Sequence, residues 1–219
     1  MEPEQSNEMD DQDPGGPGPE RAGEFGRELR AARDIAREAG VLVRSYFERW
    51  HGQDAQALKV QLKDAEEPVT EADQRASALI ISRLAEAFPD DVILSEEAAE
   101  RDSVAARSSG RVWLVDPIDG TKDFIAGRNG FAVMIGLLRD GAPVVGVVHP
   151  PLFGEVYEGV AGHGASSLAP DGTRRRLAVS SIASLADARM VSSYSHRSET
   201  VDKLRQSAGI KDELNIGSL

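Results

Sequence analysis

The chain has 219 residues, of which 40% are hydrophobic and 28% charged, as in globular proteins with one sizeable core. Its formal net charge of −12 argues against general binding to nucleic-acid phosphates, and no apolar run reaches the roughly 20 residues of a membrane-spanning helix. The absence of cysteine excludes disulfides, thiol nucleophiles and thiolate metal sites. With no secretory signal after the first methionine, we expect a cytoplasmic location.

Residues 1–22 are rich in proline, glycine and acid and contain almost no apolar side chains. Seven acids and one arginine give this segment a net charge of −6, half of the excess of the whole chain. Such a segment cannot bury enough apolar surface to offset its ordering entropy, so we predict a disordered tail, most simply a solubilising one. The predicted folded domain spans residues 23–219.

Apolar residues at spacings of three and four predict a helix from Glu24 to about Phe47. A short strand is expected near residues 58–63. A second helix is predicted from Thr70 to about Ala87, where Phe88-Pro89-Asp90-Asp91 ends it.

The rest of the chain reads mainly as strands. The predicted strands cover residues 92–95, 111–115, 131–138, 143–149, 154–160 and 189–192, and a last helix covers residues 198–208. The turn at residues 139–142 predicts a hairpin, and residues 100–110 are expected to form a mobile loop. This order of elements predicts a layered α+β fold with a largely antiparallel sheet.

Acidic residues follow three of these elements. Asp73 stands at the start of the second helix, Glu96-Glu97 follows one strand, and Asp116 and Asp119 follow another. Acids at the ends of neighbouring strands project into a common cleft, where carboxylates repel one another unless a cation binds between them. Because Mg²⁺ prefers oxygen ligands and keeps several waters, it is the expected cation.

The segment Asp116-Pro117-Ile118-Asp119-Gly120-Thr121 contains several features of a metal and phosphate site. One turn would put both aspartates on the same side, and the Ile118 carbonyl could be a further ligand. Gly120 allows a close approach of the backbone, and a short helix starting at Thr121 would direct amide groups at a phosphate. Metal ions and amides together would stabilise phosphoryl transfer to water.

Each of these features alone has a simpler interpretation. Asp-Pro-x-Asp-Gly is most often a turn, a Glu-Glu pair is most often a solvated loop, and Asp73 is most often a helix cap. The three clusters in this order, each at a strand end or a helix start, favour a common site.

Three segments resemble the inositol monophosphatase family, a family of magnesium-dependent, lithium-sensitive phosphatases of small molecules. They are Pro68-Val69-Thr70-Glu71-Ala72-Asp73, Phe88-Pro89-Asp90 with Ser95-Glu96-Glu97, and Trp113-Leu114-Val115-Asp116-Pro117-Ile118-Asp119-Gly120-Thr121. The resemblance runs from about Phe25 to the end of the chain. It implies a layered α/β/α sugar-phosphatase-like fold.

Within the family, Lys122-Asp123-Phe124 and Ser193-Tyr194-Ser195-His196 are more similar to the bacterial 3′(2′),5′-bisphosphate nucleotidases. Those proteins commonly have arginine where Tyr194 stands here. The resemblance therefore implies removal of the 3′-phosphate of adenosine 3′,5′-bisphosphate to give AMP. Hydrolysis of inositol 1-phosphate by the same site is the alternative, and a non-catalytic fragment or regulatory protein is a second one.

The resemblance implies two to three Mg²⁺ ions. Glu96, Asp116 and the Ile118 carbonyl would hold the first ion, Asp116 and Asp119 the second, and a weaker third ion would lie near Glu96. The implied partner is a small phosphorylated metabolite, with no nucleic acid and no membrane, and a homodimer is left open.

The resemblance also implies how the substrate is bound. Thr121, supported by Asp73 and beside Glu96, would help to activate the attacking water. Gly120 and Thr121 would bind the phosphate that is cleaved, and Ser195 and His196 would lie near the second phosphate of the nucleotide.

The sequence departs from the family pattern at its end. In the family, the second metal takes another aspartate from a Trp-Asp segment downstream, and this chain ends at Leu219 before any such segment. We therefore expect the C-terminal part of the fold to be incomplete, and we expect weak activity and low stability from these 219 residues alone.

Overall fold

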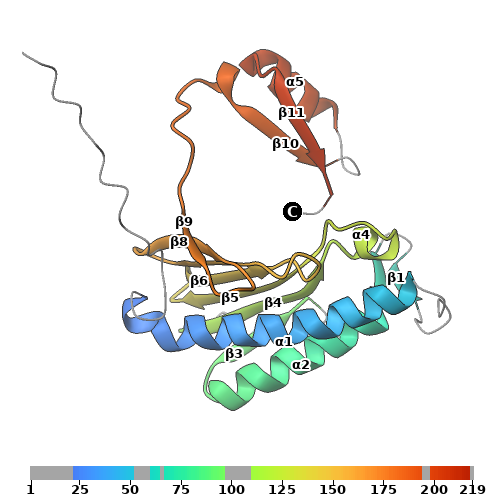
Figure 1. Cartoon of the computed structure of the whole chain (residues 1–219), viewed down its shortest axis with the longest axis vertical. Helices are drawn as coiled ribbons and strands as arrows, with labels where there is room; N and C mark the ends of the chain where they lie inside the picture. Colours follow the sequence, from blue (N-terminus) through green and yellow to red (C-terminus); the bar gives the residue numbers. More distant parts are fainter. Residues whose placement is uncertain (1–21, 52–59, 65–66, 97–109, 194–197, 218–219) are drawn as a thin grey trace, which may run out of the picture.

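The computed structural model describes residues 22–51, 60–64, 67–96, 110–193 and 198–217, without the side chains of 60–64 and 67–70. Two long helices lie side by side under a curved sheet, and a small lobe formed by the C-terminal residues stands on the other side of that sheet (Figure 1). The layered α+β architecture confirms the predicted fold class. The predicted tail, apart from Ala22, and the loop predicted at 100–110, apart from Gly110, lie outside the described residues.

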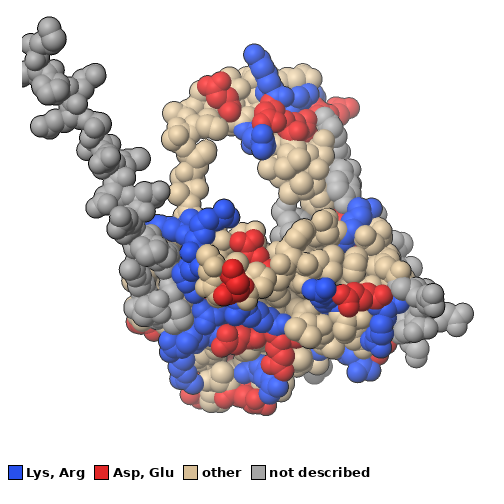
Figure 2. All heavy atoms as spheres, viewed as in Figure 1, with Lys and Arg blue, Asp and Glu red and all other residues tan. Residues whose placement is uncertain are grey.

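The two helices match their predictions closely. A 3₁₀ turn, η1 (Gly23–Phe25), leads into α1 (Gly26–Trp50), and α2 spans Glu71–Ala87. Both are amphipathic, with apolar residues buried on one side and charged residues over the outer surface (Figure 2). No helix among the described residues is long and apolar enough to cross a bilayer.

The large sheet has seven strands in chain order. They are β3 (Val92–Ser95), β4 (Arg111–Asp119), β5 (Ala132–Arg139), β6 (Ala142–His149), β7 (Val156–Val160), β8 (Gly164–Leu168) and β9 (Arg174–Leu177). Only β3 and β4 run parallel, and every other neighbouring pair is antiparallel, as the predicted sheet required. Asp140 and Gly141 join β5 to β6 with φ angles of 53° and 78°, which suit the tight hairpin predicted there.

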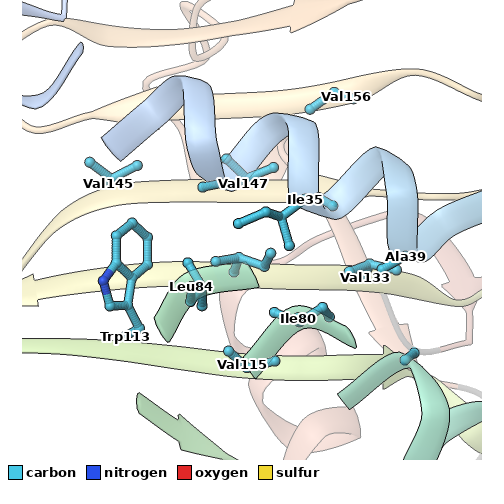
Figure 3. Close-up of a cluster of buried hydrophobic side chains, with 14 of the residues drawn as sticks. Ile35, Ala39, Ile80, Leu84, Trp113, Val115, Val133, Val145, Val147 and Val156 are labelled. Carbon is cyan, nitrogen blue, oxygen red and sulfur yellow. The ribbon is translucent and has the colours of Figure 1, made fainter. Parts of the chain in front are cut away.

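The core lies between the two helices and one face of this sheet. Leu84 and Ile80 of α2 and Ile35 of α1 project toward Trp113 and Val133 of the sheet (Figure 3). All five side chains are at most 6% exposed. Alternation along each strand directs the other set of side chains away from the helices.

Smaller elements flank this body. They are β1 (Val60–Asp64), β2 (Glu67–Thr70), the short helix α4 (Thr121–Ile125), η3 (Leu185–Asp187), β10 (Arg189–Ser193), α5 (Glu199–Ala208) and β11 (Asp212–Ile216). β1 and β2 form a hairpin, whereas β10 and β11 pair in parallel within the C-terminal lobe. The strands β2, β8, β9 and β11 were not predicted.

Candidate active site

Glu96 and Asp116 become neighbours through the pairing of β3 with β4. These strands run parallel, and Ser95 lies opposite Val115. The next residue on each strand is therefore a carboxylate at the same end of the sheet. The amide of Glu96 also donates to the Val115 carbonyl over 3.1 Å, which continues the ladder by one residue. The predicted convergence of these two strand ends is thus present in the structure.

Asp119 is brought to the same face of the sheet by an irregularity in β4. The sequence predicts that the strand ends at Asp116 and that a turn follows, but β4 continues to Asp119. Asp116 lies opposite Met134 and Asp119 opposite Ala132, so three steps along β4 match two steps along β5. One extra residue reverses the alternation of side chains, as in a β-bulge, and returns Asp119 to the face that carries Asp116.

The pKa of Asp116 reflects both its burial and its proximity to the other two acids. Burial, with further contributions from the carboxylates of Glu96 and Asp119, raises the pKa of Asp116 to about 7. The proximity of the Glu96 side chain contributes to this rise, because a protonated Asp116 can donate a hydrogen bond to the carboxylate of Glu96. The backbone amide of Ile118 donates to Asp116 and partly offsets the rise in its pKa.

A short helix follows the acids directly, as predicted. Gly120 precedes α4 with φ 87°, a left-handed conformation that glycine adopts without the steric penalty of a side chain. Its carbonyl accepts from the amides of Asp123 and Phe124, over 2.8 and 3.0 Å. The hydroxyl of Thr121 donates to the Ile118 carbonyl over 2.9 Å, so the end of β4 and the start of α4 are tied together.

An aromatic cluster holds α4 in place. Phe124 is fully buried and lies against Phe47 of α1 and Phe131, with ring centroids 5.5 and 5.2 Å apart. His51, just beyond α1, donates from Nε2 to the Phe124 carbonyl over 2.9 Å. The position of Gly120 and Thr121 therefore depends on packing at the far end of α1.

The donors in this site fit a hard divalent cation. Glu96, Asp116, Asp119 and the Ile118 carbonyl all offer oxygen, the ligand atom that Mg²⁺ prefers. Oδ1 of Asp116 is buried and has no hydrogen-bond partner among the described residues. Among all the residues that the structure describes, no three Asp, Glu, His or Cys side chains are arranged to hold a metal ion by themselves. The Ile118 carbonyl and water would have to complete the coordination.

A pocket of about 540 Å³ opens beside these acids on the face of the sheet away from α1 and α2. Its lining includes Glu96 and Asp116 at one end and Leu94, Leu114 and Met134 along the sheet. Two acidic groups thus face a largely apolar space, which strengthens their electrostatic interaction with any cation bound there.

Comparison with known proteins identifies the family of this chain. A family model described as inositol monophosphatase family matches residues 27–216. The chain belongs to the inositol monophosphatase family.

Named relatives in this family differ in their activities. The histidinol-phosphatase of Chlorobaculum parvum is 41% identical over 138 residues, which make up 63% of this chain and 49% of that protein. The 3′(2′),5′-bisphosphate nucleotidase CysQ of Salmonella typhimurium is 33% identical over 193 residues, or 87% of this chain and 73% of CysQ. The chain spans about half the length of several of the curated relatives that it matches.

A solved structure supports the same fold. The extragenic suppressor protein suhB of Bartonella henselae superimposes with a TM-score of 0.72 at 27% sequence identity. The superposition covers 87% of this chain and 70% of that chain.

Two groups of predicted family residues have roles that stay predictions. Asp73 lies in the first turn of α2 and is 4% exposed, but its predicted support of Thr121 stays a prediction. Ser195 and His196 lie outside the described residues, so their predicted contact with a second phosphate is untested.

The structure adds one residue to this region that the sequence reading did not single out. Arg128 donates from Nε to Oδ1 of Asp123 over 2.6 Å, and Asp123 is buried. A Cβ on Gly130 would lie 2.5 Å from Oδ2 of Asp123, so glycine there leaves room for the carboxylate. The acid in Lys122-Asp123-Phe124 therefore anchors the loop after α4, which only a tertiary contact could reveal.

Proposed function

We propose that this chain is a Mg²⁺-dependent phosphate monoester hydrolase of the inositol monophosphatase family. The observation that carries the proposal is the placement of Glu96, at the end of β3, beside Asp116 and Asp119, at the end of β4 and directly before Gly120 and Thr121. Carboxylates this close raise one another's proton affinity, and a divalent cation would remove that cost.

The residues of the chain would divide the work as follows. Glu96, Asp116, Asp119 and the Ile118 carbonyl would hold Mg²⁺, which supplies Lewis acidity and neutralises phosphate charge when bound. Because burial and the neighbouring acids raise the pKa of Asp116 to about 7, a cation would compete with a proton for this carboxylate. The amides of Gly120 and Thr121 would bind the phosphate, and Thr121 with Asp73 would orient the attacking water.

The favoured substrate is adenosine 3′,5′-bisphosphate, cleaved at its 3′-phosphate to AMP. The CysQ relative of Salmonella supports this choice because it aligns with 87% of the chain, and so does the Lys122-Asp123-Phe124 segment. Histidinol phosphate is a second candidate, favoured by the 41% identity of the Chlorobaculum histidinol-phosphatase. Inositol 1-phosphate remains the alternative that the family resemblance raises.

Phosphate release from the three substrates tests the proposal. With Mg²⁺, the 219-residue chain should release phosphate, fastest from adenosine 3′,5′-bisphosphate, and a chelator should abolish the release. Asp116→Asn should lower the rate by about 100-fold or more, since even the groups that orient metal ligands are worth 10–100-fold. Asp90→Asn is the matched control, because Asp90 is exposed in the turn after α2.

The outcomes separate the alternatives. Faster release from histidinol phosphate or inositol 1-phosphate would overturn the substrate choice and leave the hydrolase in place. A chain that releases no phosphate but melts at a higher temperature with Mg²⁺, an effect lost in Asp116→Asn, would be a binding-competent but inactive protein. Phosphate release that survives both the chelator and Asp116→Asn would contradict the proposed site.

A further inference from the structure

Five arginines from two distant segments form one basic surface on this acidic protein. Arg30, Arg33 and Arg37 are spaced by three and four residues on α1, so they share one side of the helix. Arg174 and Arg176 of β9 contribute two more, because they point to the face of the sheet that carries Glu158, whereas Arg175 between them points to the opposite face. We call Arg30, Arg33, Arg37, Arg174 and Arg176 the arginine face. Figure 2 shows blue side chains gathered on the side of the molecule where α1 begins and where β8 and β9 lie.

A buried carboxylate joins the two halves of the arginine face. Glu158 of β7 has no exposed side-chain surface and forms ion pairs with Arg33 at 3.5 Å and with Arg174. Arg174 also donates to the Ser166 hydroxyl over 2.8 Å. Glu158 therefore fixes two arginines, Asp34 lies 3.5 Å from Arg33, and Arg30 and Arg176 are exposed at the surface. Five arginines against these two acids give this group of residues an excess of positive charge.

The chain that precedes α1 starts from a fixed point next to this surface. Ala22 is fully buried, and Gly23 lies so close to His163 that a Cβ there would be 3.0 Å from Nε2. His163 directly precedes β8, and Ser166 of β8 pairs with Arg176. His163 lies three residues before Ser166, and Arg176 lies one strand spacing away from Ser166. The distance from His163 to Arg176 is therefore about 11 Å.

The charge of residues 1–21 is complementary to the arginine face. They carry seven acids and one arginine, a net charge of −6, whereas the remaining chain also carries −6 because the total is −12. The acids of this segment are therefore repelled by most of the body and attracted by the arginine face. A random coil of 21 residues would span about 25 Å, and tethering so near its target would give effective concentrations on the order of millimolar.

We propose that residues 1–21 bind through their acidic side chains to the arginine face of the same chain. Among the described strands, β9 is the last of the sheet, and one of its edges pairs with none of them, so that edge could accept another segment. The bound segment would cover that edge and screen the arginines from other anions. The surface is distant from the acids at the end of β4 in the sheet order, so the proposal does not depend on the phosphatase activity.

Distance measurements on the full chain test this proposal. Because the chain has no cysteine, Ser6→Cys and Thr173→Cys introduce two unique sites for spin labels. Low salt should give a population of short distances between the labels. About 1 M salt, where the Debye length is about 3 Å, should remove most of it. Arg30→Gln with Arg37→Gln and Arg176→Gln should reduce the short-distance fraction several-fold at low salt.

The control variant loses the same number of arginines, but at positions outside the arginine face. Arg44→Gln with Arg75→Gln and Arg83→Gln replaces exposed arginines on the outer helices and should leave the short distances intact. Broad distances that neither salt nor the face variants change would overturn the proposal. Short distances between singly labelled copies, one with Ser6→Cys and the other with Thr173→Cys, would assign the segment to a second copy and likewise refute intramolecular binding.

Discussion

Gly40 has no side chain, and this allows α1 to pack closely against the sheet. Gly40 is buried in α1, and a Cβ there would fall far inside van der Waals contact with the ring of His149. That ring cannot easily move, because its Nδ1 donates to the Glu155 carbonyl over 2.8 Å and the side chain is 5% exposed. Close packing of helix and ring therefore requires glycine here.

Gly40→Ala should destabilise the protein although alanine favours helices. Alanine gains about 1 kcal/mol of helix propensity over glycine, whereas overpacking a core costs about 1–3 kcal/mol. We expect the steric cost to prevail and the free energy of unfolding in urea to fall. In the background of His149→Ala, which opens the space, the same substitution should cost less or stabilise. Equal effects in both backgrounds would show that the ring is not what opposes the new methyl group.

His149 should also make stability depend on pH. Burial lowers its pKa, and the nearby positive charge of Arg37 acts in the same direction, against the hydrogen bond to Glu155. The unfolded chain therefore takes up a proton near pH 6.5 while the folded chain does not. Stability from this group is complete above pH 6.5 and is lost as pH falls toward the lower folded pKa.

Comparing His149→Gln with the unmodified chain isolates this contribution. Urea unfolding at pH 7.5 and pH 5 gives the loss of stability for each protein, and the loss should be smaller in the variant. Carboxylates titrate in both proteins, so only the difference between the two losses reports on His149. An identical loss in both would mean that the ring is protonated in the folded state as readily as in the unfolded one.

Among the elements, α2 contributes to the fold mainly through its buried leucine and isoleucine side chains. Leu84 is fully buried between the helices and the sheet, whereas Leu204 of α5 is 59% exposed. Leu84→Ala should lower the free energy of unfolding by about 2–5 kcal/mol, because it leaves a cavity. Leu204→Ala makes the same chemical change on a helix and should cost less than about 0.5 kcal/mol. A large effect of Leu204→Ala would reveal packing of α5 beyond its present contacts.

The elements with the strongest periodic pattern were predictable from the sequence. The helices α1 and α2, the strand β3 and the β5–β6 hairpin follow the expected ranges within a few residues, since each carries its own apolar pattern or turn residues. β2 was missed because Pro68 and its short polar sequence argue against a strand, and only its pairing with β1 reveals one. β8 and β9 carry glycine, serine and arginine, and tertiary contacts such as Arg174 with Glu158 stabilise them.

The candidate site was predictable in composition but not in geometry. The acids at positions 96, 116 and 119 could be recognised because they follow apolar runs in the sequence. How Asp119 reaches the face of Asp116 depends on the bulge in β4, which arises from the register with β5 and is invisible in a single strand. The same applies to Arg128, because its partner Asp123 becomes identifiable only when the loop after α4 is folded.

Across the whole molecule, burial among the described residues is concentrated in the first three quarters of the chain. Every described residue from Ala169 to Gly217 is at least partly exposed, whereas the helices and strands β4 to β7 supply most of the core. The C-terminal lobe of β10, α5 and β11 exposes Val191 and Leu214 to 54% and 47%. It meets the body beside α4, where Gly217 and Asn215 line a pocket together with Arg128.

This distribution predicts that the lobe unfolds before the body does. Local opening costs little free energy where few apolar contacts are buried and approaches the global value in the core. In native-state hydrogen exchange, amides of β10, α5 and β11 should exchange faster than those of β5 and β6, with protection that changes little in mild denaturant. The chain at residues 178–184, where Val179 is 96% exposed, should also be the first site of limited proteolysis. Equal protection of the lobe and β5 would mean that both belong to one cooperative unit. In that case the contacts beside α4 would couple the lobe to the position of Gly120 and Thr121.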